Sequence, residues 1–185
     1  MIRRNNNRRI SAVICVLILS VVMTAVSGCA KKGVPAGEKI VLEADNMKTL
    51  SEFYSNMKDT VVLYASGATS LEDFCIELEV LKEQYDVIRY IYDRDLEENP
   101  IRTGTYDYAS KAGMEGLDEM WDKIRDCLDS VYEIAIQGAS PDAVSYQYMA
   151  HQEGIVDSFQ KYLEAYYEIT GENIFEGETD TETEA

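Results

Sequence analysis

Apolar residues recur at intervals of three and four along most of the chain between residues 39 and 171. This spacing puts them on one face of an α-helix, and interruptions in the pattern divide the region into four segments. The most strand-like run is Val61-Val62-Leu63-Tyr64, and its continuation at the same helical intervals favours helix. The sequence therefore predicts an all-α fold.

Residues that start and stop helices give the expected boundaries. Gly67 follows the first segment as a C-terminal stop, and Ser70 with Asp73 forms a capping pattern before the second. Asn99-Pro100 ends the second segment, because proline disfavours helix in the residue before it. The expected helices run roughly over 39–65, from Thr69 or Ser70 to Asn99, from Thr105 or Asp107 to just before Gly138, and from Ser140-Pro141-Asp142 to Gly171.

Each expected helix has an apolar stripe that should face a common core. Four helices of roughly 25 to 30 residues with short links predict an antiparallel up-down four-helix bundle. A long two-helix coiled hairpin with accessory helices is the alternative. Gly113 and Gly116 weaken the third helix, and close approach of a neighbouring helix would explain them. The stripes are Met47, Leu50, Tyr54, Met57, Val61, Tyr64; Leu71, Phe74 or Cys75, Leu78, Leu81, Tyr85, Ile88, Tyr92; Gly113, Leu117, Met120, Ile124, Cys127, Val131, Ile134; and Val144, Tyr148, His151, Ile155, Phe159, Tyr162, Tyr166, Ile169.

The N-terminus has the order of a secretory signal. Residues 1–10 contain four arginines and no acid, and residues 10–26 form an uncharged apolar run that ends in small residues. A membrane-spanning helix is the alternative, but spanning a bilayer takes about 20 apolar residues. The run is shorter than that and favours an export signal.

Four residues at the end of this run, Val26-Ser27-Gly28-Cys29, resemble the lipobox of bacterial lipoprotein precursors. In that family the peptidase recognises residues such as Val26, Ser27 and Gly28, and the cysteine thiol receives the lipid. The resemblance implies removal of residues 1–28, acylation of Cys29, and a place on the extracytoplasmic face of the bacterial cell membrane. It implies no cofactor beyond that covalent lipid. An ordinary signal peptide that happens to precede a cysteine is the alternative.

Cleavage at this site would leave an acidic protein of one domain's size. The chain has 17 basic and 34 acidic residues, and residues 1–28 contain four of the basic ones, so the mature charge is near −21. Such a charge excludes nucleic acid as a partner. We expect a flexible tether over residues 29–38, the helical domain over 39–171 and a disordered acidic tail over 172–185.

Two cysteines, Cys75 and Cys127, stand 26 residues on either side of residue 101, near which the second and third helices join. In an antiparallel hairpin these positions are level, so an exported protein could form a disulfide between them. Two buried free cysteines are the alternative.

Acidic residues form a stripe on the expected third helix at spacings of three and four. This stripe could be a docking face for a basic partner or for cations, or a solvated outer face. It consists of Glu115, Asp118, Asp122, Asp126, Asp129 and Glu133.

Recognisable catalytic or metal-binding patterns are missing from the sequence. The single histidine, His151, has no carboxylate or thiol at helical spacing, and residues 93–99 lack the glycine and glutamate of a calcium loop. Tyrosines outside the stripes could form an aromatic patch: Tyr90, Tyr108, Tyr146 and Tyr167. The sequence thus predicts a non-catalytic helical protein that binds or scaffolds an envelope protein. The alternative is a ligand- or cation-binding module that uses the acidic stripe or a pocket between helices.

Overall fold

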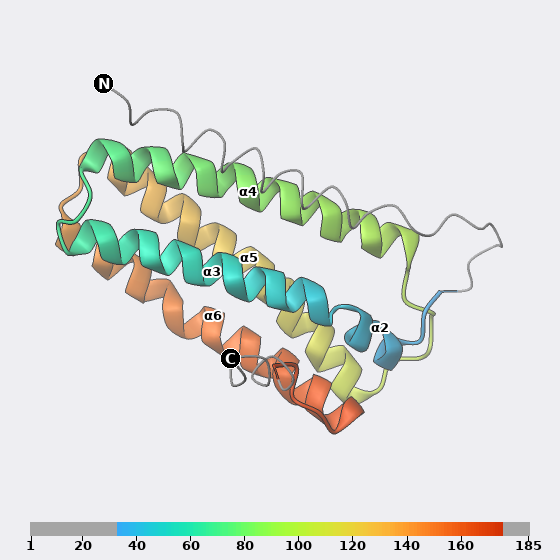
Figure 1. Ribbon diagram of the computed structural model, residues 1–185. Helices are drawn as coiled ribbons and strands as arrows, with labels where there is room; N and C mark the ends of the chain where they lie inside the picture. Colours follow the sequence, from blue (N-terminus) through green and yellow to red (C-terminus); the bar gives the residue numbers. More distant parts are fainter. Residues whose placement is uncertain (1–32, 176–185) are drawn as a thin grey trace, which may run out of the picture. The chain divides into compact units, whose positions relative to one another are not determined.

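The computed structural model describes residues 33–175, and this part of the chain is all-helical (Figure 1). Its helices are α2 (Ala36–Leu42), α3 (Ala44–Ala65), α4 (Leu71–Glu98), α5 (Tyr108–Ile136) and α6 (Pro141–Thr170). Between residues 33 and 175 there is no strand, only a single parallel bridge between Val34 and Ile101. The all-α prediction is confirmed. The predicted signal peptide over residues 1–28, with Val26, Ser27 and Gly28, and the predicted acylation site Cys29 lie outside the described residues, as do residues 176–185.

Each long helix lies against the next one in the chain, and α6 also lies against α3. The loops 66–70 and 137–140 meet at one end, here called the hairpin end, where the Tyr64 hydroxyl donates to the Ala139 carbonyl at 2.7 Å. The opposite end, here called the clip end, contains residues 33–35 and the loop 99–107. The long helices therefore run between two structurally different ends.

The capping residues act as the sequence predicts. The side chains of Ser70 and Ser140 accept hydrogen bonds from backbone N–H groups in the first turns of α4 and α6. Asp107 and Ser110 form a reciprocal capping box at the start of α5. Gly171 ends α6 in the left-handed conformation, with φ 75°. These local signals fix the starts of α4, α5 and α6 and the end of α6.

The first expected helix is different, because it is divided at Glu43. The short helix α2 begins at Ala36, inside the segment expected to be a flexible tether, and α3 follows after a one-residue break. Gly33, Val34 and Ala36 form hydrogen bonds with the loop 99–107, and residues 36–38 are helical, so the prediction of a flexible tether over 29–38 is wrong for residues 33–38. A polar tail was likewise expected from residue 172, but Ile174 is buried and Phe175 packs on Phe159.

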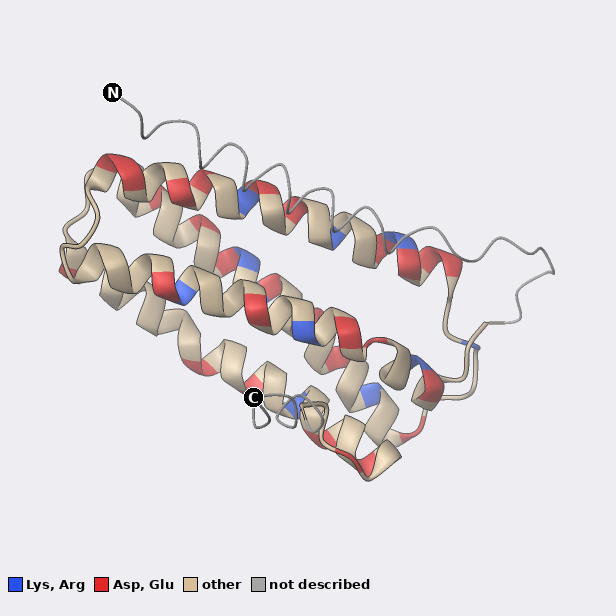
Figure 2. Ribbon diagram, viewed as in Figure 1, with Lys and Arg blue, Asp and Glu red and all other residues tan. Residues whose placement is uncertain are grey.

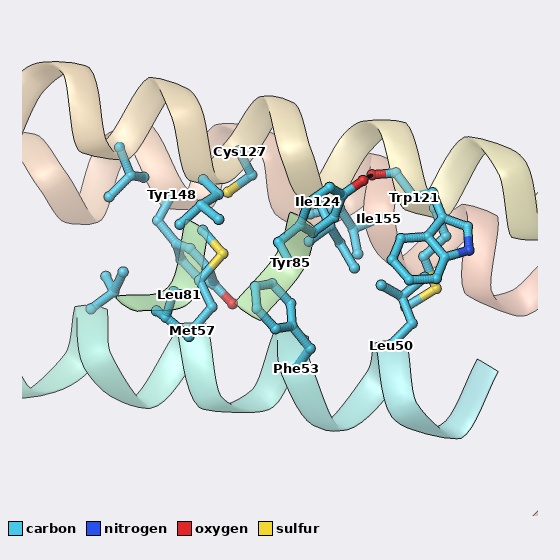
Figure 3. Close-up of a cluster of buried hydrophobic side chains, with 14 of the residues drawn as sticks. Leu50, Phe53, Met57, Leu81, Tyr85, Trp121, Ile124, Cys127, Tyr148 and Ile155 are labelled. Carbon is cyan, nitrogen blue, oxygen red and sulfur yellow. Dashed lines mark hydrogen bonds between the residues drawn. The ribbon is translucent and has the colours of Figure 1, made fainter. Parts of the chain in front are cut away.

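A continuous apolar core runs along the four long helices. Its largest fully buried side chain is Trp121, which packs against the rings of Tyr85 and Tyr92. Figure 3 shows Trp121 and Tyr85 in this core. The Tyr85 hydroxyl donates to the Trp121 carbonyl at 2.7 Å, so the Tyr85 ring is buried with its hydroxyl hydrogen-bonded. The sequence did not decide whether Phe74 or Cys75 belongs to the apolar stripe of the second helix. In the structure Phe74 is the core residue and Cys75 is half-buried.

Two glycines allow α5 to approach α6 closely. A Cβ atom added at Gly116 would lie 2.8 Å from the Ser158 carbonyl oxygen, and one added at Gly113 would lie 2.7 Å from the Ala165 Cβ. Both distances are too short for a side chain larger than hydrogen. The expected close approach of a neighbouring helix is confirmed, and the neighbour is α6.

Candidate functional site

An open hollow of about 640 Å³ lies at the hairpin end. It forms where α5 ends, Gly138 turns the chain with φ 84°, and Ser140 starts α6. Asp142 is the one ionisable carboxylate in its wall. The residues that line it are Ile134, Gln137, Gly138, Ala139, Asp142, Ala143, Tyr146 and Gln147.

One well-exposed apolar side chain, Tyr146, lines this hollow, and two others lie near its lining residues in the chain. Ile136 is the last residue of α5, and Tyr146 and Met149 lie in the first three turns of α6; all three are well exposed, Tyr146 at 77%. A protein surface with clustered large apolar groups and few charges is typical of protein contact sites rather than of catalytic sites. The sequence analysis did not identify this hollow, because it is created by a turn between two helices.

The acidic stripe on α5 does not behave as one uniform surface. Asp118 accepts a hydrogen bond from the Tyr92 hydroxyl at 2.9 Å, and burial raises the pKa of this carboxyl. Asp129 forms an ion pair with Lys82 of α4. Two of the six predicted carboxylates therefore connect α5 to α4 and are engaged within the fold.

The other four acidic residues of the stripe are exposed: Glu115, Asp122, Asp126 and Glu133. Glu115 has Lys111 one turn before it, with 3.7 Å between the Lys111 Nζ and the carboxylate. Figure 2 shows that acidic positions are distributed along all four long helices, so the stripe is one part of a generally acidic surface. Within residues 33–175 no group of three or more His, Cys, Asp or Glu side chains is placed to hold a metal ion.

Cys75 and Cys127 are not bonded to each other; both are free. The predicted level position was wrong because α4 and α5 pair in another register. Tyr132 donates to Glu79 and Lys82 contacts Asp129, so Cys127 lies opposite residues near 82 to 84, roughly two helical turns from Cys75.

The two thiols also have different surroundings. Cys127 is fully buried in the core near the ring of Tyr148 (Figure 3). Cys75 is half-buried, and its charged neighbour is Glu79.

His151 makes a hydrogen bond with Ser130, with 3.0 Å between the Nε2 and Oγ atoms. Ser130 also donates to the Cys127 carbonyl of its own helix. The histidine is half-buried between α5 and α6. Within residues 33–175, no carboxylate hydrogen-bonds to the second ring nitrogen of His151. The Ser130–His151 pair therefore lacks the third residue that orients the histidine in a catalytic triad.

The four tyrosines outside the stripes are all exposed, but they do not form a single patch. Tyr146 lies near the hairpin end, whereas Tyr108 starts α5 at the clip end, next to the C-terminal part of α6 that carries Tyr167. Tyr90 lies on α4. The hypothesis of one aromatic binding surface is therefore not supported by their placement.

A buried charged cluster joins α2 to α4, and the sequence analysis did not identify it. Lys39 is fully buried, with its Nζ 2.5 Å from Glu43 Oε1 and 2.7 Å from Asp95 Oδ2. Asn46 donates to Glu43 at 2.6 Å and Asn99 donates to Asp95 at 2.8 Å. Burial works against the charged lysine, but the two carboxylates outweigh it and raise the lysine pKa.

The three charges of this cluster pair with one another inside the fold, which indicates a structural fastening, although the buried Glu43 Oε1 makes only the ion pair and no hydrogen bond. A sequence signal existed in principle, since Lys39 and Glu43 are one helical turn apart. Nothing local distinguishes such a pair from the common surface pairs of the same spacing.

A second polar cluster, also missed in the sequence, lies between α5 and α6. Ser158 is buried and receives a hydrogen bond from Lys123 at 2.7 Å, and Glu119 binds Lys123 and Lys161. Hydrogen bonds from both lysines lower the pKa of the Glu119 carboxyl, with Lys161 contributing most. Two of its residues, Ser158 and Lys161, also lie against Gly116.

None of the helices described is long and apolar enough to span a bilayer. Comparison with known proteins gives no relative from which a function could be inferred: no family model, curated protein or solved structure matches this chain. Its function must be argued from the chemistry of its own residues.

Proposed function

We propose that this chain is a lipid-anchored protein on the extracytoplasmic face of the bacterial cell membrane, whose helical domain binds or scaffolds a protein partner without catalysis. The observation that carries the location is the sequence Val26-Ser27-Gly28-Cys29 at the end of an uncharged run that follows four arginines. Acylation of Cys29 gives the protein its attachment. Two acyl signals hold a protein at a membrane stably where a single chain does not.

The domain is an antiparallel up-down four-helix bundle in this proposal. Support comes from the neighbour relations, in which each long helix lies against the next and α6 returns to α3. The short loops 66–70 and 137–140 require antiparallel neighbours. A rigid scaffold of this kind suits the presentation of a contact surface at one end.

The partner is a membrane or envelope protein that inserts an apolar side chain into the hollow at the hairpin end. Support comes from the exposed Tyr146 in the wall of a depression with a single carboxylate, and from the exposed Ile136 and Met149 near its lining residues in the chain. Contact patches of this kind exclude water around one or two anchoring side chains. A partner of this chemistry fits the hollow better than a charged small molecule does.

Metabolic labelling with palmitate tests the anchor. Wild-type protein should carry the label and sediment with membranes, and the variant Cys29→Ser should lose both properties. Label that persists in Cys29→Ser would overturn the proposed location. Changing Cys15, which lies in the apolar run, to serine is the matched control and should leave the label in place.

Photocrosslinking in intact cells tests the partner surface. A benzoylphenylalanine placed at Tyr146 should capture a specific envelope protein, whereas the same group at the exposed Tyr90 of α4 should not. The substitution Ile136→Glu should abolish the crosslink, because it places a charge beside the apolar hollow. The crosslink should reappear when the captured protein and this chain are purified and mixed. Equal capture from both positions would contradict the assignment.

A further inference from the structure

The described residues begin at the clip end, where two backbone–backbone hydrogen bonds and one hydrogen bond to a side chain hold residues 34–36. Val34 donates to the Pro100 carbonyl at 2.8 Å, and the Arg102 N–H donates to the Val34 carbonyl at 2.8 Å. The Ala36 N–H donates to the Thr105 hydroxyl at 3.0 Å. A Cβ atom at Gly33 would lie 2.4 Å from the Pro100 oxygen, so this close approach requires glycine.

The buried ion cluster extends this attachment from the loop to a long helix. Lys39 on α2 binds Asp95 in the last turn of α4, and the Tyr162 hydroxyl of α6 donates to the Ile40 carbonyl at 2.6 Å. Residues 33–43 are thus fastened to α4, α6 and the loop between α4 and α5. The position of Gly33 is therefore fixed relative to the clip end.

Only four peptide steps separate Cys29 from Gly33, which is a reach of about 14 Å even when fully extended. An acylated Cys29 lies at the level of the lipid headgroups, so the clip end must lie near them as well. The hairpin end is separated from the clip end by nearly the length of α6, roughly 40 Å. The tether therefore specifies which end of the domain meets the membrane.

The exposed residues of the clip end suit a headgroup layer. Tyr108 is 87% exposed and Tyr106 is half-exposed, and tyrosine is favoured where one part of a side chain meets lipid and its hydroxyl meets water. Arg102 is exposed beside them. Glu97 and Glu98 are exposed nearby, so net charge does not drive this contact. The acyl chains on Cys29 and the rings of Tyr106 and Tyr108 drive it.

The acidic sides of the domain decide its orientation. Acidic positions follow all four long helices (Figure 2), and anionic phosphates repel them. Lying flat would bring the whole length of one of these helices against the membrane, whereas standing on the clip end brings shorter segments: residues 33–35, the loop 99–107, the first turn of α5 and the C-terminal end of α6 with Glu168. We infer that the clip end is a lipid-contacting surface, with Tyr106 and Tyr108 at the headgroups and the hairpin end turned away from the bilayer.

This inference rests on the proposed acylation of Cys29 and is tested by quenching with brominated lipid. The lipidated full-length protein is placed in vesicles of brominated phosphatidylcholine, which quenches indole fluorescence only at short range. Two variants are compared, Tyr108→Trp at the clip end and Tyr146→Trp near the hairpin end, which are both highly exposed sites. The natural Trp121 is fully buried and contributes the same background to each.

The indole of Tyr108→Trp should lose most of its added emission, and that of Tyr146→Trp should keep it. Quenching of both, or of Tyr146→Trp alone, would overturn the orientation. Absence of quenching at both sites in protein that carries palmitate would overturn the lipid-contacting surface and leave the anchor intact. Absence of palmitate on Cys29, measured on the same sample, would remove the anchor and this inference with it.

Discussion

A fully buried lysine is the most costly single residue in this fold. Water solvates an ammonium group strongly, so Lys39 is stable in the interior only because Glu43 and Asp95 both contact it. The substitution Lys39→Met leaves Glu43 buried without its cation. We expect the free energy of unfolding to fall by roughly 3–5 kcal/mol, measured by urea denaturation.

The control for this experiment is Lys58→Met, at an exposed position of α3, which should change stability by less than about 0.5 kcal/mol. The double variant Lys39→Met with Glu43→Leu removes the stranded carboxylate as well. It should be more stable than Lys39→Met alone, because an apolar pair replaces a half-broken ion pair. A double variant less stable than the single one would contradict this explanation.

The two cysteines of the helical domain should differ in reactivity. Burial raises the pKa of Cys127 to about 12, so almost none of its thiolate exists at pH 8 and the folded core shields it. Cys75 is half-buried, with its pKa raised by burial and then by Glu79, and reagents reach it more easily. Iodoacetamide at pH 8 should therefore modify Cys75 first in the folded protein, as peptide mass mapping would measure.

Urea without reductant should then expose both thiols to complete alkylation, because no disulfide joins them. Protein unfolded in this way that keeps Cys75 and Cys127 unmodified until a reductant is added would show that they are paired after all. Cys15 and Cys29 fall in other peptides and do not confuse the measurement.

At the scale of the helices, the contact between α5 and α6 depends on glycine at one point. The substitution Gly116→Ala places a methyl group 2.8 Å from the Ser158 carbonyl and 2.9 Å from the Lys161 Cβ, and backbone atoms cannot move aside cheaply. We expect a loss of about 1–3 kcal/mol through overpacking, even though alanine is the better helix former. Thermal unfolding followed by circular dichroism would measure it.

Gly154→Ala on α6 is the matched control. Its Cβ would meet only the flexible end of Lys123, at 3.5 Å. This variant should gain up to about 1 kcal/mol from helix propensity alone. If both variants gained stability, the close approach of α5 and α6 would not be the reason for Gly116.

Helices whose ends are specified locally could be predicted from the sequence, and those shaped by distant contacts could not. Ser70, Asp107, Ser140 and Gly171 act through neighbours three or four residues away, so their signals are visible in the chain itself. The buried ion cluster at the break near Glu43 includes Asp95, which is 52 residues further along. The same limit explains why the clip at Gly33 and the hollow beside Tyr146 were missed.

At the scale of the whole molecule, the dominant property is negative charge, formally −17 for the full chain. Such a surface repels itself, and salt screens this repulsion with a range of about 10 Å at 0.1 M. The triple variant Asp122→Asn, Asp126→Asn, Glu133→Gln removes three exposed acids that stand at spacings of four and seven on α5. It should be more stable than wild type by roughly 0.5–1 kcal/mol at low salt.

This gain should shrink at high salt, and Glu72→Gln gives a control of opposite sign. Glu72 lies in the first turn of α4, where a carboxylate favours the positive end of the helix dipole, so its removal should cost a little stability. The triple variant also separates the possible roles of the acidic stripe. If it keeps the crosslink through Tyr146, the stripe serves solvation and repulsion from the membrane. If it loses that crosslink, or loses a calcium-induced thermal shift seen in wild type, the stripe takes part in binding, and the hollow at the hairpin end is not the whole contact surface.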